Sequence, residues 1–140
     1  MRIAMILIAA AAVMQTPASQ PVTPKAVAPM SELMVKVIFP FSDAIFYIDR
    51  DGPLNEGQWM ALETKTLTLA EMANLMMSPG RAYNQDQWMK DAQLIVNVAT
   101  SAYKFAKARD QKAIADLNAE LYESCQSCHE HYRPGYRRRL

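Results

Sequence analysis

Cysteine, histidine and glycine are all scarce in this chain. Its 140 residues include 2 Cys, 2 His and 4 Gly. A zinc site needs four ligands, so it could draw only on two cysteines and two histidines crowded into residues 125–131. Strand-like runs are also few, whereas Ala, Leu, Met, Gln, Glu and Lys abound, and this composition is helical. We therefore predict an all-α protein of one domain, with enough hydrophobic residues (51%) to bury a core.

The N-terminal apolar run is short. Arg2 precedes an apolar stretch at residues 3–13, and residues 16–18 are small enough for cleavage, which together indicate a secretory signal. The run is too short for a spanning helix, although an uncleaved membrane anchor is the alternative. No cysteine follows it, so a lipoprotein is not expected. We predict a signal peptide over residues 1–18 and a proline-spaced, flexible lead-in over residues 19–29.

The chain also lacks an excess of either charge. It has 15 basic and 14 acidic side chains, and loss of residues 1–18 removes only Arg2 from this count. The mature protein is therefore expected to be close to neutral. This balance indicates no nucleic-acid partner.

After the lead-in, apolar residues recur at helical spacing in four stretches. We expect helices over residues 31–48, 55–77, 86–109 and 110–133. Ser31 and Asp110 are the expected N-caps of the first and last helices, and Pro40 should kink or split the first helix near Ile38. Four amphipathic helices with short loops favour an antiparallel up-down-up-down four-helix bundle over residues 30–140.

The most specific pattern is Cys125-Gln126-Ser127-Cys128-His129. Cys-x-x-Cys-His is the signature of covalent haem c attachment. Each thiol adds to one vinyl group of the porphyrin, and the histidine that follows can ligate the iron. In bacteria this attachment takes place outside the cytoplasmic membrane, which agrees with the signal peptide and predicts the periplasm. A redox-active cysteine pair, a zinc site and a structural disulfide remain alternatives, although a redox pair normally opens a helix in a βαβ unit.

A methionine is the candidate for the second axial ligand of the iron. In the expected bundle, the end of the last helix lies beside the start of the first helix, the end of the second and the start of the third. The methionines at that end of the bundle are Met30, Met34, Met72, Met76, Met77 and Met89. A His/Met pair raises the reduction potential of a haem, so the identity of this ligand decides what the protein does.

The motif extends to Tyr132 and Arg133, reading Cys-x-x-Cys-His-x-x-Tyr-Arg. A four-helix bundle with this motif in its last helix resembles the cytochrome c′ family. The resemblance implies that His129 is the proximal ligand and that Arg133 lies by the proximal face. It also implies that a side chain from the first turns of the first helix, here Met34, covers the distal face. In low-spin members a methionine at that place binds the iron, whereas in gas-binding members a non-ligand leaves the iron five-coordinate.

Arg81 follows a Pro-Gly turn at the expected haem end, where its guanidinium is a natural partner for a haem propionate. We therefore expect a periplasmic c-type haem protein that carries single electrons on His/Met-ligated iron. No substrate chemistry is expected, and the redox partner is not named by the sequence. The alternative is a five-coordinate haem protein that binds nitric oxide or carbon monoxide. Members of the cytochrome c′ family are often homodimers through their first two helices, so the resemblance implies a possible homodimer.

Overall fold

The computed structural model describes residues 25–50 and 52–133. The predicted signal peptide and residues 19–24 of the lead-in lie outside the described residues. Residues 25–29 precede the first helix and form no regular element. Within the described residues the protein is all helical, as predicted.

The first helical segment consists of three short elements in direct succession. These are α1 (Met30–Leu33), η1 (Met34–Ile38) and α2 (Phe39–Phe46), and η1 is a π-helical turn. Pro40 has no N–H to donate to the carbonyl four residues earlier, and the wider turn lies directly before it. The predicted interruption near Ile38 is therefore present. The predicted N-cap at Ser31 is wrong, because the helix begins at Met30 and the Pro29 carbonyl accepts its first N–H bonds.

The second segment is α3 (Glu56–Met76), and its N-terminus is closed by a capping box. Asn55 Oδ1 accepts from the Gln58 N–H at 3.0 Å, and Gln58 Oε1 accepts from the Asn55 N–H at 2.9 Å. Its buried face has the 3-4 spacing of a bundle seam. The residues of this seam are Trp59, Leu62, Thr66, Leu69, Ala73 and Met76.

The third and fourth segments are α4 (Gln87–Ala108) and the pair α5 (Gln111–Asp116) and α6 (Asn118–Tyr132). Asp110 caps α5 as predicted, since its side chain accepts from the Ala113 N–H. The last helix was expected to be continuous, but it is divided at Leu117.

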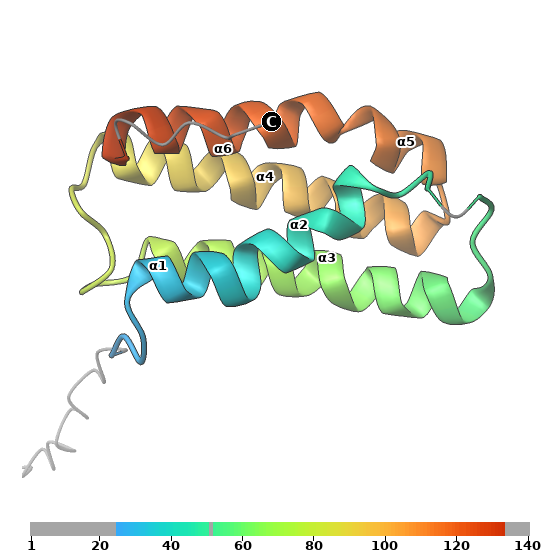
Figure 1. Ribbon diagram of the computed structural model, residues 1–140, viewed down its shortest axis with the longest axis horizontal. Coiled ribbons are helices and arrows are strands. Elements are labelled where there is room, and N and C mark those ends of the chain that lie inside the picture. Colours follow the sequence, from blue (N-terminus) through green and yellow to red (C-terminus); the bar gives the residue numbers. More distant parts are fainter. Residues whose placement is uncertain (1–24, 51, 134–140) are drawn as a thin grey trace, which may run out of the picture.

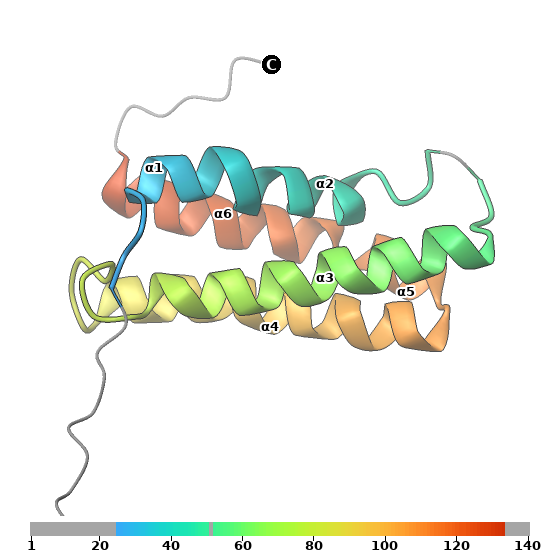
Figure 2. The same ribbon diagram turned by 90° about the horizontal axis from the view of Figure 1, so that it is seen from below.

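The four segments lie side by side (Figures 1 and 2). The start of α1, the loop between α3 and α4 and the C-terminal end of α6 lie at one end of the molecule. The loop between α2 and α3 lies with α5 at the other end. Many side chains of the core between the segments have no solvent exposure, and the largest of these are Ile45, Leu69, Met76, Ile114 and Leu121.

Candidate functional site

The residues of the Cys-x-x-Cys-His motif lie on the last two turns of α6. Cys128 is a buried free thiol with 5% exposure, while Cys125 is half-buried and packs against the core. His129 is half-buried beside them. At about 100° per residue, these three side chains fall within an arc of roughly 100° on the helix. One side of α6 therefore carries two thiols and an imidazole, which is the donor set that covalent haem attachment requires.

The opposite side of this turn is bonded to α4. Asp91 of α4 is 1% exposed, and its carboxylate accepts from Ser127 Oγ at 2.8 Å. The His131 Nδ1 lies 2.9 Å from the other carboxylate oxygen. Gln87, one turn earlier on α4, donates its side-chain amide to the same carboxylate at 3.0 Å.

Asp91 is a residue that sequence reasoning missed. The signal that could have found it is its place three residues after Trp88 and four before Ile95, a spacing that puts all three residues on one face of a helix. A charged residue on such a face requires a hydrogen-bonded partner when it is buried. His131 is exposed and lies on another side of α6 from His129, with Asp91 as its partner.

Burial raises the pKa of the Cys128 thiol to about 11, with smaller contributions from the nearby charges of Asp91 and Cys125. A thiol of this kind stays protonated at neutral pH and is not an activated nucleophile.

The pKa of the His129 side chain shifts in the opposite direction from that of Cys128. Burial lowers the pKa of its imidazole, and the positive charge of Arg133 lowers it further. The neutral imidazole is the form whose lone pair can bind a metal. Arg133 follows the end of α6, where its N–H donates to the His129 carbonyl at 2.8 Å. The structure therefore brings together Cys125, Cys128, His129 and Arg133.

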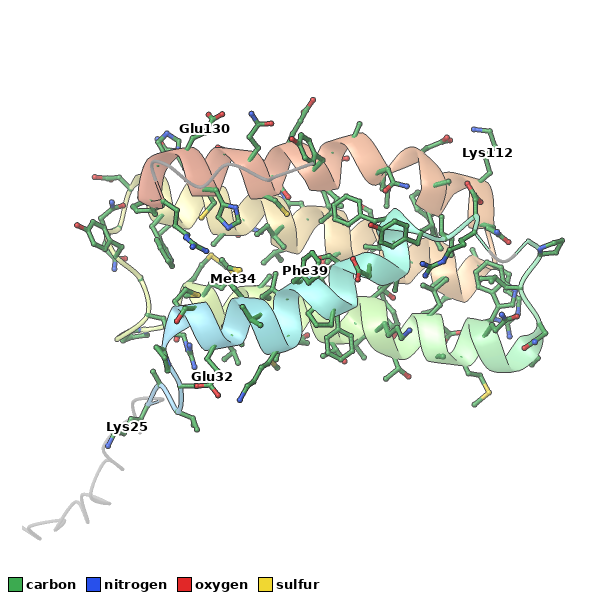
Figure 3. The ribbon with its side chains drawn as sticks, viewed as in Figure 1. Lys25, Glu32, Met34, Phe39, Lys112 and Glu130 are labelled. Carbon is green, nitrogen blue, oxygen red and sulfur yellow. The ribbon has the colours of Figure 1, made fainter. Side chains whose placement is uncertain are left out.

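Met34 lies on the first helical segment, at the start of the π-helical turn. In the view of Figure 3 it lies between the ribbon of this segment and that of α6. Its half-buried side chain packs against the core, as do Met30, Met72, Met77 and Cys125. Among the described residues, α6 packs mainly against α4, and its close backbone approaches to α1 and η1 are sparse. The two helices that carry Met34 and His129 are thus neighbours across the end of the bundle without tight backbone contact.

Arg81 lies in the loop between α3 and α4, at the same end of the molecule (Figure 1). Its guanidinium donates to the Ala28 carbonyl at 3.1 Å and lines a cavity of about 350 Å³ with Gly80 and residues 26–30. The arginine therefore ties this loop to the residues before α1.

Aromatic side chains hold the last turn of α6 to the loop between α3 and α4 and to the first turn of α4. The Tyr132 ring meets the Trp88 and Tyr83 rings edge to face, at centroid distances of 4.9 and 5.3 Å. The Tyr132 hydroxyl accepts from the Asn84 side-chain amide at 2.8 Å. Trp88 is buried and Tyr83 is 78% exposed, so only Trp88 is a core residue.

The cysteines and histidines of α6 do not form a cluster that surrounds a single metal ion. Within residues 25–50 and 52–133, no three His, Cys, Asp or Glu side chains form a group that could hold a metal ion. The zinc alternative would need such convergence, whereas haem attachment needs one imidazole and two separate thiols. The residues present fit the requirements of haem attachment better than those of a zinc site.

No helix in the described part of the chain is long and apolar enough to cross a membrane. Comparisons with family models, with characterised proteins and with solved structures found no match to the chain.

Proposed function

We propose that this protein is a periplasmic c-type cytochrome that carries single electrons, built as a cytochrome c′-like, antiparallel up-down-up-down four-helix bundle. Cys125 and Cys128 are the covalent anchors of one haem c, and His129 is the proximal iron ligand. Met34 is the sixth ligand. The redox partner is a protein of unassigned identity, and the homodimer implied by the resemblance belongs to the same proposal.

The observation that carries this proposal is the arrangement of α6. One side of its last two turns holds the two cysteines together with a histidine whose pKa is lowered by burial. Burial raises the pKa of the Cys128 thiol, and within residues 25–50 and 52–133 no three metal-ligating side chains form a cluster. Four partly buried methionine thioethers, including that of Met34, pack on the same core as Cys125.

Haem, when bound, supplies a one-electron couple, and the protein sets its potential through axial ligation and burial. His129 provides an uncharged imidazole because its burial and Arg133 both disfavour the proton. Met34 provides a soft thioether, which favours the reduced iron. Arg133 remains beside the proximal histidine, and Arg81 offers a guanidinium at the same end of the molecule for a propionate.

The second candidate function is a haem protein that binds a diatomic gas on an open distal face. The observation that favours it is that Met34 is only half-buried on the first segment, so the same side chain can pack beside the haem without binding iron. Under this alternative the iron is five-coordinate, and nitric oxide or carbon monoxide occupies the distal side.

An absorption spectrum of the full chain, produced in a host that attaches haem, tests both functions. We expect a haem stain that survives denaturation and a six-coordinate, low-spin spectrum that is unchanged by carbon monoxide. A high-spin spectrum that shifts with the gas would replace electron transfer with gas binding. Absence of covalent haem from the purified chain would reject both functions.

A further inference from the structure

The buried carboxylate of Asp91 links α4 to the candidate haem-attachment segment. Burying a carboxylate costs several kcal/mol unless it is hydrogen-bonded, and here three side chains supply that bonding. One is Gln87 of the same helix, and the other two are Ser127 and His131 of α6. Ser127 lies between the two cysteines, and His131 lies two residues after the histidine of the motif.

The two α6 residues that Asp91 bonds lie opposite His129. At about 100° per residue, Ser127 and His131 are each roughly 160° from His129 around the helix axis, on opposite sides. They are only about 40° apart from each other, so the carboxylate meets one narrow strip of α6. A helix held by this strip has its rotation about its own axis fixed, with His129 and Cys125 turned away from α4.

We propose that Asp91 is a positioning residue for haem attachment. Through Ser127 and His131 it sets the rotation of α6, and so presents the His129 imidazole and the Cys125 thiol to the side away from α4. This inference rests on the proposed function, since it names the residue that orients the same site. Its carboxylate also lies close enough to Cys128 to help raise the pKa of that thiol, so Asp91 stands beside one of the two proposed haem anchors.

The test compares three variants of the full chain in a haem-attaching host. Asp91→Asn keeps the shape of the side chain and removes its charge, and Ser127→Ala deletes one of the two bonds from α6. Glu123→Gln is the matched control, because it removes the same charge from an exposed position of α6. Three quantities are measured: the reduction potential, the iron–histidine stretching frequency of the reduced protein, and hydrogen exchange of the amides in residues 124–132.

We expect Asp91→Asn to shift the potential upward, because a negative charge near the iron favours its oxidised form. The iron–histidine frequency should shift, and exchange in residues 124–132 should rise at least tenfold. Ser127→Ala should shift the frequency and raise exchange by a smaller factor, without the upward shift in potential. Glu123→Gln should change none of the three.

A frequency and an exchange rate in Asp91→Asn equal to those of Glu123→Gln would overturn the proposal. So would a lower melting temperature with an unchanged haem signature, since Asp91 would then serve stability alone. If Asp91→Asn does not fold, Ser127→Ala decides by the same two readouts. If the parent chain carries no covalent haem, the proposed function fails by itself, and exchange in residues 124–132 still decides whether Asp91 fixes α6.

Discussion

Burial of the Cys128 side chain sets how readily its thiol can react before haem is attached. The pKa is raised from 9.0 to about 11, and at pH 8 this lowers the thiolate fraction by roughly 100-fold. We expect iodoacetamide to alkylate Cys128 about 100-fold more slowly in the folded, haem-free chain than in urea. A Cys125→Ser background isolates this thiol, and circular dichroism checks that the chain is helical. Equal rates in the folded and unfolded chains would contradict the burial that the structure shows.

The same shift makes stability depend on pH at the alkaline side. Folding raises the pKa of an acid here, so the folded chain holds its proton when the unfolded chain has lost it. The contribution of the Cys128 thiol to the free energy of unfolding is therefore present below pH 9 and is lost as the pH rises from 9.0 toward about 11. Urea titrations of the same haem-free chain at pH 8 and pH 10 should show a lower free energy of unfolding at pH 10. In Cys128→Ala the part of this decrease that comes from the thiol should be absent.

Met34 decides between the two proposed haem functions. In Met34→Ala we expect the low-spin spectrum to become high-spin and the reduction potential to fall, because the thioether that favours reduced iron is gone. Met60→Ala is the matched control, since Met60 is 63% exposed and lies on α3 near its N-terminal end, away from the predicted haem end. A spectrum and a potential that stay at parent values in Met34→Ala would assign Met34 to packing and favour the gas binder.

At the residue scale, the Cys-x-x-Cys-His motif and its place on the last helix could be predicted from the sequence. The hydrogen bonds that join this part of α6 to α4 could not. The spacing of Cys125, Cys128 and His129 is local, and a helix converts it directly into one side. The partner of Ser127 and His131 is 36 and 40 residues distant along the chain. Only the packing of α4 against α6 brings Asp91 to that place. Haem attachment and the role of Met34 stay predictions.

Among the helices, the capping box of α3 is a local feature with a measurable energy. Asn55 and Gln58 bond each other's backbone N–H groups at 3.0 and 2.9 Å. Asn55→Ala should lower the free energy of unfolding by about 1 kcal/mol, measured by urea titration. Thr64→Ala is the control within α3, because the exposed Thr64 hydroxyl only bonds back to the Met60 carbonyl. That variant should stay within about 0.5 kcal/mol of the parent, and a comparable loss in both variants would refute the assigned role of the cap.

The bounds of α3 and α4 and the start of α5 lie within one residue of those predicted. At α3 and α5 the N-cap side chains of Asn55 and Asp110 are local features that the sequence itself carries. The first segment shows where such patterns stop. Pro40 predicts an interruption but not its form, and a π-helical turn at Met34–Ile38 shifts the register of the residues before it. Expectation and structure also differ at Ser31, because the chain is already helical at Met30 and the Pro29 carbonyl accepts the first N–H bonds. The break at Leu117 has no proline or glycine beside it, so the sequence pattern did not predict it.

Across the whole molecule, the two ends are held by separate sets of contacts. At the predicted haem end, Asp91 and Tyr132 join α6 to α4 and to the loop that follows α3. At the other end, the Gln111 side-chain amide lies within 3.0–3.2 Å of the Ile48 and Gly52 carbonyls and of Asp49 Oδ1. A helix such as α3, with its 21 residues, is about 30 Å long, so these two sets of contacts do not touch.

Gln111→Ala tests whether the ends are independent. It removes the donor that ties α5 to the loop between α2 and α3, so we expect a loss of about 1 kcal/mol in the free energy of unfolding. Hydrogen exchange should rise at residues 47–50 and 52–54, while the absorption spectrum and the reduction potential stay at parent values. Lys112→Ala, which removes only an exposed ion pair with Asp116, should lie within about 0.5 kcal/mol of the parent. A shift in spectrum or potential in Gln111→Ala would mean that α5 and α6 transmit strain across Leu117, and the bundle would then behave as one coupled body rather than as two independently held ends.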